Sequence, residues 1–297
     1  MIKKNSARNW RDITITARDG TTLYGRHYPA PRTNWRPVLC LAGLTRNSRD
    51  FHVLATALSS EQGRARDVFT FDCRGRGQSE NAPDWKDYIV PVEMLDVQDF
   101  MASQHLDDAA LIGTSRGGLI AMAMAAVQPS LIGAVILNDI GPIIDKLGLM
   151  RISKYVSQMP TPRTWQDATH VLLQGVSHMF PDVGEEEWAD IARQWFNERN
   201  GRPVVGYDPQ IVRTFSQETG ELPDLWPLFR ALKRVPCLVI RGALSDLLSQ
   251  ATVEQMCRQH LQCSAIEVPR QGHAPLLRDK PTLQAISKFL AEADDTT

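Results

Sequence analysis

A serine stands at the centre of a glycine-rich turn, residues 113–117, whose sequence is Gly-Thr-Ser-Arg-Gly. The apolar run Ala109–Gly113 leads into the turn, and a helical apolar pattern over Arg116–Val127 follows it. A tight strand-turn-helix connection needs glycines on both sides of the serine, because side chains there would collide with the turn. The turn exposes the Ser115 hydroxyl at a helix N-terminus, which favours developing negative charge. Ser115 is therefore the candidate nucleophile, and a coincidental Gly/Ser turn is the alternative.

A histidine near the carboxyl end has the position required of a base for Ser115. A serine hydroxyl is a weak nucleophile until a base removes its proton. His273 lies in residues 271–275 (QGHAP), after the apolar run Ala265–Val268. The other six histidines fall in the amino-terminal strand, in expected helices or in a central helical region. We therefore expect His273 to be the base.

Two aspartates compete for the third role, which is to orient the imidazole and stabilise its charged form. Asp246 lies in the loop after the apolar run Cys237–Ile240, at the strand end where open α/β sheets place their sites. Asp139 follows the run Gly133–Leu137 and could instead stabilise a turn. The chain order Ser, Asp, His places the acid after the penultimate strand. This rule favours Asp246.

Acyl transfer also needs hydrogen-bond donors for the developing oxyanion, and two backbone N–H groups usually supply them. The residue after the nucleophile, Arg116, is the first expected donor. Leu44, in the loop after the run Val38–Ala42, is the second. The sequence leaves the role of the nearby Arg46 open.

Another glycine-rich turn, residues 72–79 (DCRGRGQS), also follows an expected strand. Its arginines, Arg74 and Arg76, could bind a substrate anion through charge-assisted hydrogen bonds. They could equally anchor the loop network around the site.

The elements that must position these residues follow a regular alternation. Segments Asp12–Thr16 and Thr22–Tyr28 flank the turn pair Asp19-Gly20 and predict an antiparallel hairpin. Near-continuous apolar runs then predict strands buried on both faces of a parallel sheet: Val38–Ala42, Val68–Phe71, Ala109–Gly113, Gly133–Leu137, Cys237–Ile240 and Ala265–Val268. Helical patterns lie between them: Phe51–Gln62, Val92–Gln104, Arg116–Val127, Val253–Leu261 and Thr282–Ala293. The alternation predicts an α/β fold with a mostly parallel, doubly wound sheet.

The alternation breaks once, between Leu137 and Cys237, where no convincing strand is found. Amphipathic spacing, including Trp188–Arg199, predicts several short helices separated by prolines. We expect residues 142–232 to form a helical cap inserted into a core of residues 1–141 and 233–297. Four tryptophans of this region could line a substrate pocket or pack in a core: Trp165, Trp188, Trp195 and Trp226.

Composition excludes several classes of protein. The chain has 297 residues, 33 basic and 34 acidic, with 43% hydrophobic residues, as expected of a globular protein that is not drawn to nucleic acid by its charge. Its five cysteines are an odd number without a C-x-x-C motif, which favours a reducing compartment. No secretory signal or membrane-spanning run is recognisable. We therefore expect a cytoplasmic protein without a nucleic-acid or membrane partner.

Together these motifs resemble those of the α/β-hydrolase fold. The motifs GTSRGG, DCRGRGQS, RGALSD and QGHAP are similar to those of its lidded, epoxide-hydrolase-like group, which includes small esterases, lactonases and carbon–carbon bond hydrolases. The resemblance implies Ser115, Asp246 and His273 as the triad. Members commonly carry His-Gly before the oxyanion residue, whereas this chain has Ala42-Gly43. Relatives that are epoxide hydrolases or haloalkane dehalogenases use Asp as nucleophile, so Ser115 argues against both activities.

The expected activity is hydrolysis of a small carboxylic ester or lactone through an acyl-enzyme. Carbon–carbon hydrolysis of a diketone-type substrate and perhydrolysis can use the same triad and remain alternatives. A non-catalytic ligand-binding receptor on the same fold is a third, because fold does not fix function. The sequence contains neither phosphate-binding glycine loops nor zinc-ligand spacing. We therefore expect a small-molecule substrate and no cofactor or metal.

Overall fold

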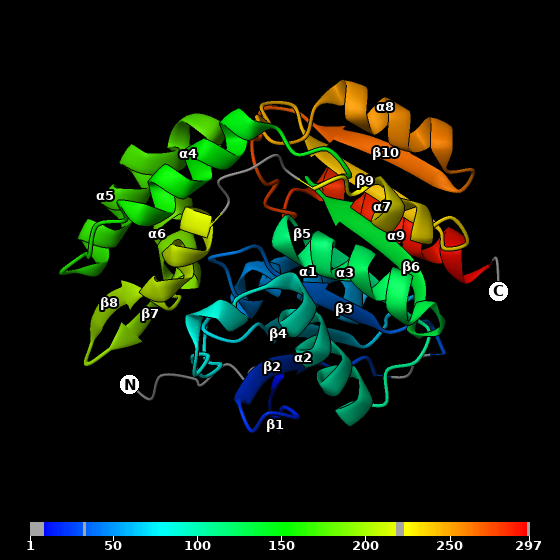
Figure 1. The fold of residues 1–297 in the computed structure, drawn as a ribbon, viewed down its shortest axis with the longest axis horizontal. Helices are drawn as coiled ribbons and strands as arrows, with labels where there is room; N and C mark the ends of the chain where they lie inside the picture. The colour runs from blue at the N-terminus through cyan, green and yellow to red at the C-terminus, as the bar shows by residue number, and fades with distance from the viewer. Residues whose placement is uncertain (1–8, 32–33, 218–222, 296–297) are drawn as a thin grey trace.

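A central sheet of eight strands organises the protein (Figure 1). The structure, a computed structural model, describes residues 9–31, 34–217 and 223–295. The strands run in the order β1-β2-β4-β3-β5-β6-β9-β10 across the sheet. Their bounds are β1 Arg11–Thr16, β2 Thr22–Tyr28, β3 Val38–Leu41, β4 Val68–Asp72, β5 Ala109–Thr114, β6 Ile132–Asn138, β9 Cys237–Gly242 and β10 Cys263–Val268.

The sheet begins antiparallel and continues parallel, as predicted. β1 pairs with β2, and β2 with β4, in antiparallel registers. Gly20 adopts a φ of 90° in the connecting turn, a conformation that favours glycine. The remaining pairs, from β4-β3 to β9-β10, are all parallel. The carboxyl ends of these parallel strands therefore meet at one edge of the sheet, where an active site is expected.

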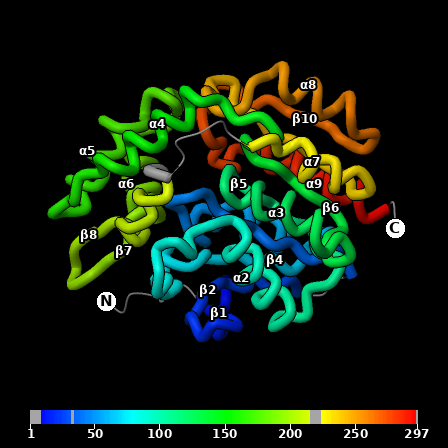
Figure 2. Tube along the Cα trace, in the orientation of Figure 1, coloured from blue at the N-terminus to red at the C-terminus, as the bar shows by residue number. Residues whose placement is uncertain are grey.

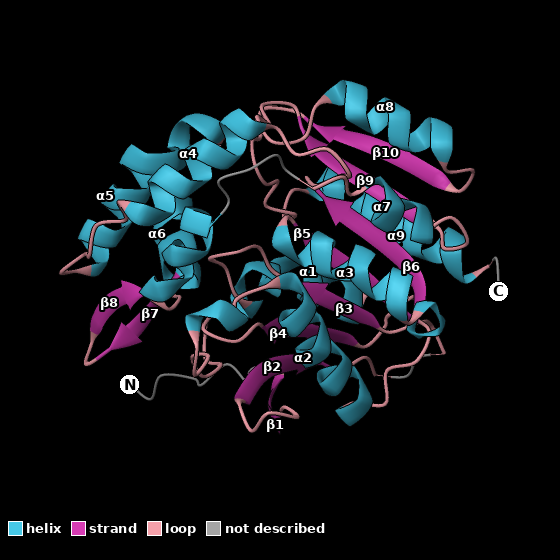
Figure 3. Cartoon of the chain, viewed as in Figure 1, coloured by secondary structure: helices cyan, strands magenta, loops and turns pink. Residues whose placement is uncertain are grey.

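Helices cover both faces of the sheet (Figure 3). On one face α1 (His52–Ser60) and α9 (Lys280–Asp294) bury apolar side chains, and on the other α2 (Val90–Ser103), α3 (Arg116–Val127), α7 (Trp226–Ala231) and α8 (Gln250–Gln259) do so. Short 3₁₀ helices occur at η1 Ser48–Phe51, η2 Trp85–Asp87, η3 Pro129–Leu131, η4 Ser177–Met179 and η5 Pro209–Gln217. Among the helices of the described ranges, none has the length and apolar character needed to cross a membrane.

A separate group of elements lies beyond the carboxyl ends of the strands, at the upper left of Figure 2. It comprises α4 (Lys146–Ser157), α5 (Trp165–Val176), α6 (Glu185–Trp195), β7 (Phe196–Arg199) and β8 (Arg202–Val205), and we call it the cap. The cap has its own hydrophobic core, centred on the fully buried Trp188. Because the cap has its own core, its inner surface can contribute to a pocket without unfolding the cap.

The cap contains a two-stranded hairpin, so the prediction of a wholly helical insertion was wrong. The helical pattern was extended to Arg199, but α6 ends at Trp195 and β7 begins at the next residue. The missed signal is Asn200-Gly201, whose φ values of 53° and 74° suit a two-residue hairpin turn.

The carboxyl end of the insertion also differs from the expected residue 232. α7 packs against α3, and its Phe229 is buried in the main core with residues of the sheet. By packing, α7 therefore belongs to the α/β core, and the cap ends before Trp226.

All five cysteines are free thiols. Cys40, Cys73 and Cys237 are buried, as expected of small apolar side chains, whereas Cys257 and Cys263 are only half-buried. Burial raises the pKa of the Cys257 thiol to about 11, which keeps it protonated at neutral pH.

Candidate active site

Ser115 lies in a strained turn between β5 and α3. Its φ of 50° and ψ of −113° place a non-glycine residue in a sparsely populated region. A Cβ on Gly113 would lie 2.5 Å from the Gly118 backbone, and one on Gly117 would lie 2.1 Å from the Leu41 carbonyl oxygen. The flanking glycines are therefore sterically required, as the motif predicted.

His273 reaches Ser115 from the loop after β10. Its Nε2 lies 2.9 Å from the Ser115 Oγ, and its Nδ1 lies 2.8 Å from the Asp139 Oδ2. The loop is anchored to the neighbouring strand end, because the Asn138 side-chain amide donates to the Pro275 carbonyl at 3.0 Å. The predicted pairing of Ser115 with His273 is therefore present as a hydrogen bond.

The acid beside the imidazole is Asp139, so the assignment of Asp246 to this place was wrong. Strand order explains the difference, because β6 lies directly beside β5 and Asn138 pairs with Thr114 in their shared register. Ser115 follows Thr114 and Asp139 follows Asn138, so Ser115 and Asp139 lie side by side at the carboxyl edge of the sheet. Chain order does not distinguish the two acids, because both aspartates fall between Ser115 and His273.

The Asp139 carboxylate is fully buried and held by three donors. Besides His273, the Gly242 N–H donates to its Oδ1 at 2.9 Å and the Ser245 hydroxyl donates to its Oδ2 at 2.5 Å. Such hydrogen bonds offset the cost of burying a charge. Sequence reasoning missed Ser245, although it lies in the loop where the acid was expected.

Asp246 instead links the core to the cap. Its carboxylate forms a bidentate ion pair with Arg151 of α4, with N···O distances of 2.5 and 2.8 Å. Burial acts to raise the pKa of Asp246, but the hydrogen bonds and charge of Arg151 outweigh it and hold the pKa below its usual range. Asp246 is thus an ionised partner for the cap.

Of the two expected oxyanion donors, Leu44 borders the cavity in front of Ser115, and Arg116 directly follows Ser115 in the chain. Leu44 lies in the loop after β3, and Arg116 is the first residue of α3. In the described part of the chain neither N–H donates to a backbone or side-chain acceptor. A Cβ on Gly43 would lie 3.7 Å from the Ser115 Cβ, so this loop lies against the nucleophile. Both N–H groups are therefore free to donate hydrogen bonds to a negatively charged oxygen.

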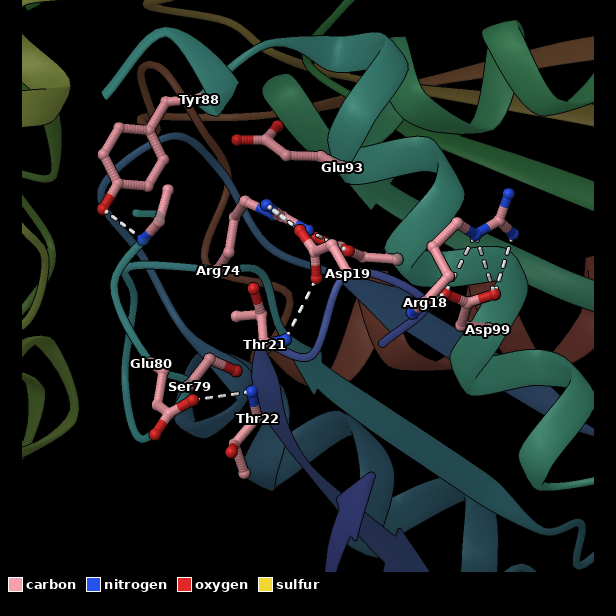
Figure 4. A network of polar contacts seen from close by, with 12 residues as sticks. Arg18, Asp19, Thr21, Thr22, Arg74, Ser79, Glu80, Tyr88, Glu93 and Asp99 are labelled. Atoms are coloured by element: carbon pink, nitrogen blue, oxygen red, sulfur yellow. Dashed lines mark hydrogen bonds and ion pairs between the residues drawn. The ribbon is translucent and has the colours of Figure 1, made fainter. Parts of the chain in front are cut away.

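Arg74 and Arg76 anchor loops, which is one of the two roles left open by the sequence. Arg74 is buried and pairs with Asp96 and with Asp19, within the polar network of Figure 4. Arg76 donates to the Leu44 carbonyl at 2.8 Å and pairs with the buried Glu93. Arg76 thereby fixes the loop that presents the Leu44 N–H.

Comparison with known proteins identifies the family of the chain. A model of the alpha/beta hydrolase family matches residues 38–285. The chain belongs to the alpha/beta hydrolase family. This alpha/beta hydrolase is 33% identical over 274 residues to the 3-hydroxybutyrate-oligomer hydrolase of Cupriavidus necator, covering 88% of the chain and 90% of the relative. It is 31% identical over 266 residues to an sn-1-specific diacylglycerol lipase of Mus musculus, covering 86% and 80%.

A solved alpha/beta hydrolase from Novosphingobium aromaticivorans superposes with a TM-score of 0.87 at 36% identity, covering 95% of this chain and 98% of that one. The predicted fold class is thus confirmed, and the chain is a hydrolase.

A cavity of about 110 Å³ separates Ser115 and His273 of this alpha/beta hydrolase from the cap. Core loops and cap helices both line it, the cap through residues such as Tyr155 of α4 and Trp195 of α6. Of the four tryptophans in question, Trp195 borders the cavity and Trp188 packs in the cap core. Within the described residues no three His, Cys, Asp or Glu side chains are grouped to hold a metal ion.

Proposed function

We propose that this alpha/beta hydrolase cleaves a small carboxylic ester or lactone through an acyl-enzyme. The observation that carries the proposal is the continuous hydrogen-bonded path from Ser115 through His273 to the buried Asp139. In this reaction the Ser115 Oγ attacks the ester carbonyl, and its proton passes to the His273 Nε2. The charge that develops on the carbonyl oxygen is stabilised by the N–H groups of Leu44 and Arg116.

The second half of the reaction uses the same groups. His273 returns the proton to the departing alcohol oxygen, which leaves an acyl group on Ser115. A water molecule then loses a proton to His273 and attacks the acyl carbon, which releases the acid and restores Ser115. Asp139 stabilises the imidazolium in both halves. The small cavity favours a compact substrate over a polymer chain.

Hydrolysis and covalent trapping test the proposal together. We expect the purified protein to hydrolyse p-nitrophenyl acetate and butyrate in the presence of a metal chelator. A serine-directed fluorophosphonate should abolish this activity and add its mass to the peptide that contains Ser115. A protein that neither hydrolyses esters nor accepts the label would contradict the proposal and favour a ligand-binding role. Preferential turnover of diketones would favour carbon–carbon hydrolysis.

Ser245 provides a separate prediction about the acid. Ser245→Ala removes the hydroxyl donor to the Asp139 Oδ2 but leaves the Gly242 N–H and His273 in place. A hydrogen bond to a charged group contributes about 1.5–3 kcal/mol, so we expect kcat to fall about tenfold or more. Ester hydrolysis measured from pH 5 to 9 checks this, with Ser157→Ala, at an exposed position of α4, as control. An unchanged kcat would show that the hydroxyl does not support the acid.

A further inference from the structure

The cavity in front of Ser115 contains one cation whose charge is only partly balanced. Three arginines line it: Arg46, Arg151 and Arg278. Arg151 is neutralised by Asp246, and Arg278 lies 3.1 Å from a Glu187 carboxylate oxygen. Among the described residues, Arg46 forms an ion pair only with Asp50, which also lines the cavity and lies 3.7 Å from its Nε. Three carboxylates therefore face the three arginines, and Arg46 has the longest of the three ion pairs.

The guanidinium of Arg46 is buried, and not all of its N–H groups have hydrogen-bond partners among the described residues. Its plane lies over the indole of Trp195, and its Nη1 is buried without a hydrogen-bond partner among the described residues. Burial lowers the pKa of Arg46 and raises that of Asp50, so both charges are poorly compensated by the surrounding protein. An unpaired buried charge is costly, and a carboxylate ligand would remove much of that cost.

A second donor lies beside Arg46. The Tyr155 hydroxyl is also buried without a hydrogen-bond partner within the described ranges, and Tyr155 borders the same cavity. Burial raises its pKa to about 12, so the hydroxyl keeps its proton at neutral pH and can donate. Arg46 comes from the core loop after β3, whereas Tyr155 comes from cap helix α4. The two donors therefore meet where the core and the cap close over the cavity.

The position of Arg46 relative to the nucleophile limits the size of the ligand. A Cβ on Gly43 would lie 3.7 Å from the Ser115 Cβ and 3.8 Å from the Arg46 Cγ. Arg46 and Ser115 therefore both adjoin Gly43, and both line the same cavity. A carboxylate on Arg46 and an ester carbonyl on Ser115 can belong to one small molecule.

We infer that Arg46 and Tyr155 form a carboxylate-binding subsite, and that the substrate is a small ester that carries a free carboxylate. This inference rests on the proposed ester hydrolysis and specifies its substrate class. Arginine binds carboxylates through paired N–H donors, and the tyrosine hydroxyl supplies a third contact. A neutral ester of the same shape leaves both donors unpaired and is discriminated against.

A matched pair of substrates tests the inference. The wild-type protein should release acetate from 3-acetoxybutyrate with a higher kcat/KM than from its methyl ester. Arg46→Gln should lower kcat/KM for the acid about 100-fold, the scale of removing one partner of a desolvated charge pair, and leave the methyl ester nearly unchanged. Tyr155→Phe should reduce the same preference by a smaller factor, and Arg46→Lys should restore part of it.

The control is Arg193→Gln, because Arg193 is also stacked on a tryptophan, Trp165, but is exposed and does not line the cavity. It should leave both substrates unchanged. Equal losses on both substrates in Arg46→Gln would overturn the subsite, since they indicate a role in packing. A wild-type protein that cleaves both esters equally well would overturn it too.

Binding without turnover separates this inference from the proposed function. Calorimetry with the Ser115→Ala protein should detect 3-hydroxybutyrate but not its methyl ester, and the added Arg46→Gln change should abolish the signal. If binding follows this pattern while the wild-type protein cleaves no ester, the proposed function fails and the subsite stands. If esters are cleaved but 3-hydroxybutyrate does not bind, the subsite fails and the proposed function stands.

Discussion

Asp139→Asn is expected to lower kcat for ester hydrolysis by about ten-thousand-fold at neutral pH, the loss seen when a triad carboxylate becomes an amide. The amide keeps the shape of the side chain but has no negative charge with which to stabilise the imidazolium, and its NH2 group can donate to the His273 Nδ1. The amide favours the His273 tautomer that has its proton on Nε2. In that tautomer Nε2 cannot accept the proton of Ser115. Steady-state kinetics with a p-nitrophenyl ester measures the effect, and circular dichroism verifies that the fold persists.

Asp246→Asn is the matched control, because it makes the same chemical change in a neighbouring loop outside the triad. It weakens the partly exposed ion pair with Arg151, and such pairs contribute about 1 kcal/mol or less. We expect kcat to fall by tenfold or less on that scale. The reverse ranking of the two variants would restore Asp246 as the acid and remove Asp139 from the mechanism.

Ser115→Ala and His273→Ala are each expected to lower kcat by about a millionfold, because nucleophile and base act as one unit. The double variant should lose no more than either single variant for the same reason. Both substitutions remove atoms from the cavity wall, so the midpoint temperature of thermal unfolding should change little. Rates are measured with enough protein to exceed the background hydrolysis of the ester.

The kcat of the double variant, compared with that of each single variant, tests whether Ser115 and His273 act as one unit. If the two losses multiplied, Ser115 and His273 would act independently, contrary to the hydrogen bond between them. Activity near the wild-type level in Ser115→Ala would place the nucleophile elsewhere.

Local patterns were sufficient to predict the core elements. The apolar run and helical pattern around Ser115 correspond to β5 and α3, and α3 has the predicted bounds Arg116–Val127. Strands buried on both faces consist of uninterrupted apolar residues, so their limits are visible in the sequence. The cap hairpin was less visible, because apolar spacing from Trp188 to Phe196 suits a helix until the turn at Asn200-Gly201 is weighed against it.

The acid could not be chosen from local patterns, because the choice depends on which strands are neighbours. Asp139 and Asp246 both follow apolar strands and both precede His273 in the chain. Only the order β5-β6-β9 shows that Asp139 lies one strand from Ser115, whereas Asp246 lies in a loop beyond the next strand. The buried state of Arg46 is likewise a tertiary property, created by the cap residues Tyr155 and Trp195 that close over it.

The cap is attached to the core more firmly at its hairpin side than at its α4 side. At its hairpin side the Gly77 N–H donates to the Gly206 carbonyl at 2.8 Å, and the Asp208 N–H donates to the Gly75 carbonyl at 2.7 Å. Arg49 adds a hydrogen bond to the Gln194 carbonyl at 2.9 Å. These three hydrogen bonds attach this side of the cap firmly to the core.

At the α4 side, a single backbone bond from Asp145 to Leu247 accompanies the Arg151–Asp246 ion pair, whose side chains are 29% and 37% exposed. Water competes readily for such a pair. The α4 edge is therefore held to the core less firmly than the hairpin side of the cap. Asp246, which does not contact His273 through a hydrogen bond, instead helps to hold α4 against the core.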